Sequence, residues 1–328
     1  MKAISKKQSL AVPVRALINY LSGKPLVVIF EVTLSCNARC RHCNIGVSYP
    51  NEKRLAPEEY QSYISEMRPA IVQLSGGEPL LREDLPEIVE SIKLGHCMPY
   101  VIVVTNGYLL NEEKYLELKR AGVDRFSVSL DFPNEKHDEF RRLRGLYAHL
   151  EKTLPLLASH GHGDIAVNCA ITQANLMYLE ELAHNCSEWD ISISYSAYSM
   201  LRTGDPSYLV CTEGDLKVLQ KIIRNLVAIK HESGSILNST STLLSMHTFF
   251  KEGGIPGCNA GVRFLFVQPD GAINPCSMHR DKRYHSRKEM VELFSNRNRC
   301  KQCYVACRAY TDKSLWSLSR DVLEYARY

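Results

Sequence analysis

The chain has 328 residues, of which 45% are hydrophobic and 23% are charged, and its formal net charge is +4. This composition is ordinary for a soluble globular protein, and no run of about 18 apolar residues predicts a transmembrane helix. The N-terminus lacks the short apolar core and the cleavage site of a secretory signal, so we expect a cytoplasmic protein.

The first 25 residues form a basic amphipathic segment. Residues 1–24 carry five Lys or Arg residues and no acid. Apolar residues recur along the same segment, which predicts a helix that either covers the floor of the following domain or rests on a membrane surface; we favour the first. These apolar residues are Leu10, Val12, Val14, Leu17, Ile18 and Leu21.

From residue 26 to residue 232, short β-branched runs alternate with amphipathic helical patterns. Such alternation is typical of right-handed βαβ units and of a parallel sheet. We therefore predict an α/β fold in which six such units form a partial (β/α)6 barrel, similar to part of a TIM barrel. The runs lie at residues 26–33, 71–75, 100–105, 124–130, 164–171 and 190–196.

Three cysteines follow the first predicted strand, in the sequence Cys36-Asn-Ala-Arg-Cys40-Arg-His-Cys43. In a reducing cytosol, clustered cysteines more often ligate metal than form disulfides. Three thiolates on a four-iron cluster leave one iron open for a further ligand, whereas four-cysteine sites are usually closed electron carriers. Zinc is the alternative for such a string taken alone.

Polar and glycine-rich sequence collects at the ends of the following strands. In parallel α/β folds, ligands bind at the carboxyl ends of the strands, so we expect these residues to share one site. They are Ser75, Gly76, Gly77 and Glu78 after the second strand, Asn106 after the third, Ser129 and Asp131 after the fourth, and Asn168 in the fifth.

The order of these motifs resembles that of the radical S-adenosylmethionine (SAM) superfamily. The resemblance implies a [4Fe–4S] cluster on Cys36, Cys40 and Cys43, with SAM on the open iron. Reductive cleavage of SAM would then release a 5′-deoxyadenosyl radical.

The resemblance also implies roles around SAM. The Gly76-Gly77 backbone would meet the amino group, Asn106, Ser129 and Asp131 belong to the strand-three and strand-four motifs, and His42 would pack on adenine. An arginine after the fourth strand would meet the carboxylate. The candidates for it are Arg141, Arg142 and Arg144.

After residue 232 the alternation stops. Cys258 precedes an apolar run at 262–267, a Pro-Asp-Gly turn at 269–271 and Cys276, which predicts a β-hairpin that brings two cysteines together. Further cysteines follow at Cys300, Cys303 and Cys307.

This ending resembles the twitch extension, a shortened relative of the SPASM extension of radical SAM enzymes. The resemblance implies that residues 233–328 hold one auxiliary [4Fe–4S] cluster on four of the five cysteines, with Cys303 and Cys307 as alternatives for one position. A structural zinc is the competing interpretation.

The sequence is less informative about the substrate. We expect Tyr195, Tyr198 and Arg202 near the mouth of the barrel and take them as candidate catalytic residues. The basic N-terminus, the Gly-Gly-Glu-Pro-Leu-Leu string at 76–81 and the ending at 300–307 resemble the branch that transfers adenosyl to hopanoid lipids. A small-molecule or lipid substrate is therefore expected, with a peptide maturase and a non-catalytic metal-binding scaffold as alternatives.

Charge patterning predicts partners as well. Residues 279–301 carry eight Lys or Arg residues against three acids, which predicts docking of an acidic electron donor, a flavodoxin or a ferredoxin. A nucleic-acid-binding protein would show a larger continuous basic face with interleaved aromatic residues, so we expect no nucleic-acid partner.

Overall fold

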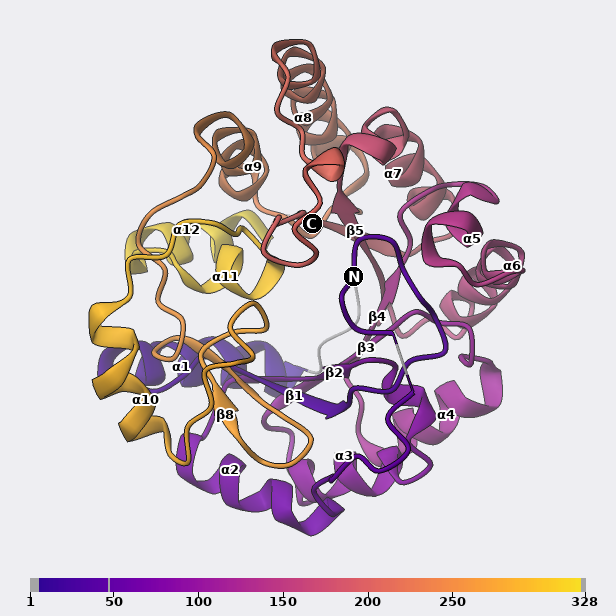
Figure 1. Ribbon diagram of the computed structural model, residues 1–328. Coiled ribbons are helices and arrows are strands. Elements are labelled where there is room, and N and C mark those ends of the chain that lie inside the picture. Colours follow the sequence, from indigo (N-terminus) through magenta and orange to yellow (C-terminus); the bar gives the residue numbers. More distant parts are fainter. Residues whose placement is uncertain (1–5, 47, 326–328) are drawn as a thin grey trace.

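One curved sheet organises the molecule (Figure 1). The computed structural model describes residues 6–46 and 48–325 of the chain. Their strands follow the order β6-β5-β4-β3-β2-β1-β7-β8, and the sheet stays open because β6 and β8 are its edges. The predicted α/β partial barrel is confirmed. The strands are β1 (Val27–Thr33), β2 (Ile71–Gly76), β3 (Tyr100–Thr105), β4 (Arg125–Ser129), β5 (Ile165–Ile171), β6 (Ser192–Ala197), β7 (Phe264–Val267) and β8 (Ile273–Asn274).

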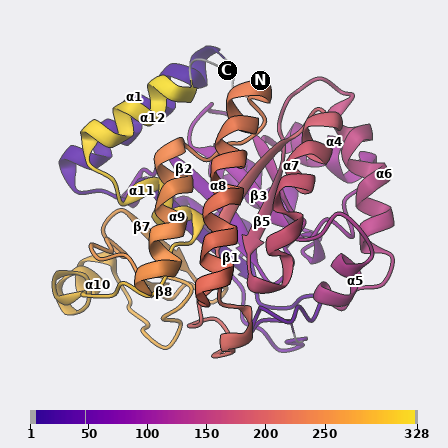
Figure 2. The same ribbon diagram turned by 90° about the horizontal axis from the view of Figure 1, so that it is seen from above.

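Helices cover the outer side of the sheet (Figures 1 and 2). The helices of the described residues are α1 (Lys6–Ser22), α2 (Tyr60–Met67), α3 (Leu85–Lys93), α4 (Glu112–Ala121), α5 (Lys136–Arg141), α6 (Leu146–Ala158), α7 (Leu179–Glu188), α8 (Glu213–Ser233), α9 (Thr240–Glu252), α10 (Arg287–Leu293), α11 (Ala306–Thr311) and α12 (Leu315–Tyr325). Short 3₁₀ turns lie at Pro57–Glu59, Pro79–Leu81, Gln173–Tyr178, Pro206–Tyr208 and Ser295–Arg297.

Capping residues set the bounds of these helices. The Asn111 side chain accepts a hydrogen bond from the Lys114 amide at 2.8 Å and begins α4, and Gly122 ends it with φ +114°. Thr212 and Gly234 begin and end α8 in the same way. Polar side chains that satisfy the first amides, and glycines that adopt positive φ after the last turn, are the usual helix limits.

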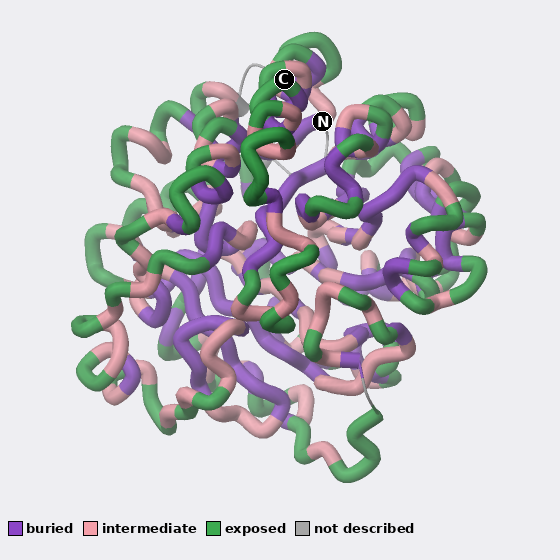
Figure 3. Tube along the Cα trace, turned by 45° about the horizontal axis from the view of Figure 1, so that its top comes forward, coloured by how far each residue is buried: buried purple, intermediate pink, exposed green. Residues whose placement is uncertain are grey.

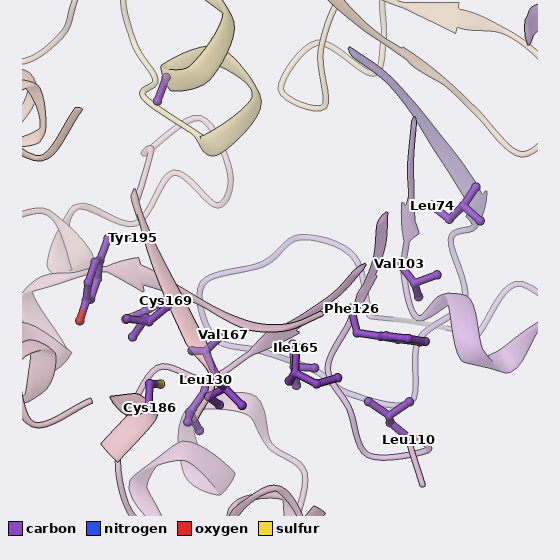
Figure 4. Packing of buried hydrophobic residues seen from close by; sticks show 14 of the residues in the cluster. Leu74, Val103, Leu110, Phe126, Leu130, Ile165, Val167, Cys169, Cys186 and Tyr195 are labelled. Atoms are coloured by element: carbon purple, nitrogen blue, oxygen red, sulfur yellow. The ribbon is translucent and has the colours of Figure 1, made fainter. Parts of the chain in front are cut away.

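The two sides of each strand differ in polarity. Leu74, Val103, Phe126 and Val167 are fully buried against the helices (Figure 4). Because successive side chains of a strand point to opposite faces, the residues between them face the inside of the curve. Figure 3 shows that the buried residues gather in the interior of the molecule and that the exposed residues lie mostly on the surrounding helices and loops.

The C-terminal segment continues the same sheet. β7 and β8 form the predicted hairpin, with Val267 opposite Ile273. β7 also pairs in parallel with β1, where Val27 lies opposite Phe264, and this contact was not predicted. The predicted boundary between residues 232 and 233 falls in the last turn of α8. The cysteine-rich extension is thus joined to the barrel through main-chain hydrogen bonds.

α1 covers the floor of the barrel, as we favoured. The side-chain amide of Asn19 donates to the carbonyl oxygens of Pro25 and Arg68, at 2.7 and 2.9 Å. The side-chain amide of Gln8 donates to the Asp124 carboxylate at 2.6 Å. Of the predicted segment 1–25, residues 1–5 lie outside the described residues. Among the described residues, no helix combines the length and the apolarity needed to span a bilayer.

Candidate active site

A cavity of about 250 Å³ lies at the carboxyl end of the strands, where the motifs converge. The inward-facing residues of the strands form its wall, and residues from the C-terminal segment complete it. Of the residues singled out from the sequence, those lining the cavity are His42, Cys43, Ser75, Gly76, Ser129, Arg141, Asn168, Tyr198, Arg202 and Cys307.

The loop of residues 36–43, called the cysteine loop below, lies against one side of this cavity. Its backbone is held by α5, because the amides of Arg39 and Arg41 donate to the carbonyl oxygens of Arg141 and Phe140, at 3.3 and 3.0 Å. Cys36, Cys40 and Cys43 are half-buried free thiols.

Burial disfavours the thiolate form of two of these thiols. Burial raises the pKa of Cys36 to about 11 and also raises the pKa of Cys40, which the nearby Arg141 guanidinium opposes. Ligation requires the thiolate, so the positive charge of iron would have to offset this burial. Three thiols on one short loop form a suitable donor set for a cluster with one open iron.

Gly76 and Gly77 pack directly on the backbone that leads into the cysteine loop. A Cβ atom on Gly76 would lie 2.0 Å from the Thr33 carbonyl oxygen, and one on Gly77 would lie 2.1 Å from that of Ser35. The Gly77 amide donates to Thr33 at 2.7 Å, and the Glu78 amide donates to Ser35 at 2.9 Å. The glycines therefore position the loop, in addition to the predicted contact with SAM, which stays a prediction.

Glu78 lies behind the cavity wall and joins neighbouring segments. Its fully buried carboxylate accepts from the Thr105 hydroxyl at 2.6 Å and from the Asn106 amide at 2.7 Å. The Asn106 side chain donates to that of Asn37 in the cysteine loop at 2.7 Å. Both residues position this loop in the structure, and their contact with SAM stays a prediction.

The structure distinguishes among the three candidate arginines. Arg141 is buried and lines the cavity, whereas Arg142 and Arg144 are exposed and do not. The Arg141 guanidinium donates to Asp131 from Nε at 2.8 Å and from Nη2 at 2.7 Å, and its Nη1 lies 3.9 Å from Cys40 Sγ.

Asp131 itself is fully buried and holds this arginine in place. Burial alone would raise the pKa of Asp131, but Arg141, with two neighbouring histidines, lowers it below its ordinary value. Asp131 does not line the cavity, so its predicted contact with SAM would act through Arg141.

His137 completes this buried group in its neutral form. Its Nδ1 accepts a hydrogen bond from the Asp131 amide at 3.2 Å. Burial, reinforced by the positive charge of Arg141, lowers the pKa of His137 from 6.5 to about 3. Below pH 6.5 the unfolded chain therefore binds a proton that the folded chain does not bind.

We expect His137 to make folding less stable as the pH falls. A lowered folded-state pKa means that its contribution is complete above pH 6.5 and is lost on acidification toward pH 3. Between pH 7 and pH 5 the loss amounts to about 2 kcal/mol. Urea unfolding of the apoprotein at both pH values should show this loss, and His137→Gln should remove it. The control is His184→Gln, on the exposed face of α7, which should leave the pH dependence of the free energy of unfolding unchanged. The prediction would be contradicted if His137→Gln kept the pH dependence of the original chain, or if His184→Gln reduced it equally.

His42 stacks on a protein ring. Its imidazole lies parallel to the Phe140 ring, with the centroids 4.6 Å apart and the planes 9° apart. Burial lowers the pKa of His42 to about 4, so the ring is neutral near pH 7. It lines the cavity, and its predicted packing on adenine stays a prediction.

Four of the five C-terminal cysteines line a second, smaller cavity. They are Cys258, Cys276, Cys300 and Cys303. The predicted hairpin brings the first two together, and the loop before α11 supplies the others. Cys307, in the first turn of α11, lines the large cavity instead. No three His, Cys, Asp or Glu side chains in residues 6–46 and 48–325 are placed to share a single metal ion.

Tyr195 is not at the mouth of the barrel, so this expectation was wrong. Its side chain lies on the outward side of β6, beside Cys169 (Figure 4), and its hydroxyl donates to the Leu179 carbonyl oxygen at 2.7 Å. Tyr198 lines the cavity, but its hydroxyl already bonds Thr203 and Asp205.

Two cavity residues were missed as site residues. Glu31 lies on the inward side of β1, is 3% exposed, and forms an ion pair with Arg280 from the segment after β8. A lone acid within an otherwise apolar strand was the available signal for Glu31. Arg280 was assigned to the docking surface for an electron donor, and its burial in the cavity corrects that assignment.

Known proteins resemble this chain in sequence. The family model described as "Radical SAM superfamily" matches residues 30–183. A protein of Oleidesulfovibrio alaskensis named AdoMet-dependent heme synthase is 26% identical over 76% of this chain and 69% of its own length. A protein of the same name from Methanosarcina barkeri is 28% identical over 78% of each chain.

A solved structure has the same fold. The crystal structure of Streptococcus suis SuiB bound to its precursor peptide SuiA aligns with a TM-score of 0.61 and 16% identity, over 94% of this chain and 70% of SuiB.

Proposed function

We propose that this radical SAM enzyme, whose radical SAM domain is formed by residues 30–183, modifies a small organic substrate in the cavity at the carboxyl end of its sheet. The observation that carries the proposal is that Cys43, the ends of the strands and the C-terminal segment all line one cavity. A [4Fe–4S] cluster held by Cys36, Cys40 and Cys43 would supply the one electron that splits SAM into methionine and the 5′-deoxyadenosyl radical.

The chain's own residues bind and shield the reactants. We assign the SAM carboxylate to Arg141, whose charge is fixed beside Cys40 by the buried Asp131. Apolar side chains from several elements wall the cavity and limit the access of water to a reactive radical. They are Ile29, Val104, Phe266 and Met278.

We propose a small molecule rather than a peptide as the substrate. The curated relatives that cover most of the chain are named heme synthases, and heme carries carboxylate side chains. The likeness to SuiB is one of fold alone at 16% identity, so it supports the peptide alternative less. A lipid substrate, suggested by the resemblance to the hopanoid branch, is the second member of the proposed class.

We also propose one auxiliary [4Fe–4S] cluster, bound by Cys258, Cys276, Cys300 and Cys303. The support is that these four thiols line one cavity, whereas Cys307 lines another. His279 contacts Cys300 and lowers its pKa, which favours the thiolate needed for ligation. An acidic flavodoxin or ferredoxin is the proposed electron donor, on the part of the basic stretch outside the cavity.

Anaerobic reconstitution tests this function. Protein loaded with iron and sulfide should bind about eight iron atoms as two four-iron clusters. With SAM and dithionite it should release 5′-deoxyadenosine. Zinc without sulfide-bound iron, or a fully loaded protein that releases no 5′-deoxyadenosine, would instead support the metal-binding scaffold.

We further propose that α1 contacts an anionic membrane surface. Its polar residues bind the barrel floor, so its apolar side faces outward, where Leu10 and Leu21 are 73% and 70% exposed. Val14, Leu17 and Ile18 are exposed between them on the same side of the helix, and an apolar row of this length is unusual on a free surface. The helix and the residues before it carry basic residues and no acid, which complements anionic lipid.

Vesicle binding should depend on these leucines. We expect the chain to co-sediment with phosphatidylglycerol vesicles more than with phosphatidylcholine vesicles. Because a buried leucine contributes about 1.5–3 kcal/mol, Leu10→Ser should weaken binding about tenfold or more. Met177→Ser, at a residue that is 74% exposed elsewhere, is the matched control. Equal binding by both variants would contradict a role for α1.

A further inference from the structure

The charged side chains that line the large cavity do not balance. Glu31 is the acid among them, whereas Arg141, Arg202 and Arg280 are cations. Arg141 is paired with the buried Asp131, and Arg280 is paired with Glu31. One positive charge remains in excess.

That excess charge belongs to Arg202, in the loop after β6. Within the described residues Arg202 forms no ion pair, and its Nη2 donates to the hydroxyl of Ser277 at 3.2 Å. A neutral hydroxyl satisfies one N–H group of a guanidinium, which presents five. The remaining groups of Arg202 are available to an acceptor in the cavity.

Arg280 is also incompletely satisfied. It is largely buried, yet its Nε has no hydrogen-bond partner. Removing a charged group from water costs free energy unless its N–H groups are bonded, so an unmet Nε at a cavity wall favours an additional acceptor. Glu31 is 3% exposed and accepts from one terminal nitrogen of Arg280.

The two arginines reach the cavity from different parts of the fold. Arg202 comes from the barrel, and Arg280 comes from the segment after β8, which lies next to the end of β1 (Figure 1). Both line the large cavity together with Cys43, and Arg280 pairs with Glu31. An anion held between them would therefore lie in the same cavity as Cys43.

We propose that Arg202 and Arg280 together bind a carboxylate of the substrate, and that Glu31 orients Arg280 and competes with that carboxylate. This inference rests on the proposed function and specifies its substrate class as a carboxylate-bearing small molecule. Guanidinium groups bind carboxylates through paired, charge-assisted hydrogen bonds, which a neutral amide of the same shape cannot reproduce.

The opposite effects of two substitutions make the proposal testable. Arg202→Gln removes the unpaired cation, so it should weaken carboxylate binding. Glu31→Gln removes the competing carboxylate and frees Arg280, so it should strengthen the same binding. A merely structural role of the group would lower affinity in both variants.

The probe is sodium propionate, with propionamide as its neutral counterpart at equal ionic strength. Reconstituted full-length protein saturated with SAM should be stabilised against heat by propionate and not by propionamide. The propionate dissociation constant derived from this shift should rise at least tenfold in Arg202→Gln and fall in Glu31→Gln. Arg202→Lys should recover part of the affinity, and Arg224→Gln, on the exposed side of α8, should match the original chain.

Defined results would overturn the proposal. One is equal stabilisation by propionate and propionamide, and another is an unchanged propionate dissociation constant in Arg202→Gln. The third is a loss of SAM binding in Arg202→Gln as large as its loss of propionate binding, which would assign Arg202 to SAM. If Glu31→Gln does not fold, the comparison of Arg202→Gln with Arg202→Lys decides the question. Failure of the proposed function differs from all of these, because the original chain would then release no 5′-deoxyadenosine.

Discussion

Cys40→Ala is expected to abolish formation of 5′-deoxyadenosine from SAM. Cys40 is the central cysteine of the loop, and Arg141 Nη1 lies 3.9 Å from its sulfur. Substitution of a residue that merely orients a metal ligand already costs about 10–100-fold, so loss of a ligand should cost more than about 100-fold. The measurement is 5′-deoxyadenosine released by reconstituted protein with dithionite, together with its iron content.

Two further cysteine variants make this result specific. Cys211→Ala, at an exposed position, should retain full iron content and cleavage. Cys276→Ala should lose the auxiliary iron and substrate turnover but retain part of SAM cleavage, because Cys276 lines the smaller cavity and not the large one. If Cys40→Ala and Cys276→Ala behaved alike in cleavage, the proposed division between the two cysteine sets would be wrong.

The barrel could be predicted from the sequence because the patterns that specify its strands and helices are local. β-branched runs and amphipathic patterns determine which segments form strands and helices, and parallel strands place their carboxyl ends on one side. That reasoning located Cys43, Ser75, Ser129 and Asn168, which all line the cavity.

Tyr195 shows where that reasoning was incomplete. Its prediction used only its place at the end of a strand and ignored the two-residue alternation of strand side chains. Ser196 lies on the inward side of β6 and lines the cavity, so Tyr195, one residue earlier, must face α7. The alternation of Ile193 and Tyr195 with serines carried this information.

Other features depend on contacts between distant segments, which no local pattern encodes. Glu31 and Arg280 are 249 residues apart in the chain, and they meet because β7 pairs with β1. The outward apolar side of α1 likewise reflects the polar anchors of Gln8 and Asn19 on the barrel floor. Amphipathicity alone would have turned that side inward.

Gly77→Ala is expected to impair the enzyme almost as severely as loss of a cysteine. The new methyl group would lie 2.1 Å from the Ser35 carbonyl oxygen, a backbone atom that cannot move without displacing Cys36 next to it. Misplacement of a reacting group by about 1 Å can cost about 100-fold in rate. We therefore expect about a 100-fold loss of 5′-deoxyadenosine formation, measured under the conditions used for Cys40→Ala.

The matched control is Gly214→Ala in the first turn of α8. A Cβ atom there would contact only the Thr212 side chain, at 3.9 Å, so this variant should retain activity and full stability. Gly77→Ala differs from a ligand loss in one respect: its three loop thiols are intact, so some cluster iron should still bind. Full activity in Gly77→Ala would show that the loop tolerates the displacement, and the glycine pair would then have no positioning role. Reduced activity with retained iron would support a positioning role, because the cysteines would be present but misaligned with SAM.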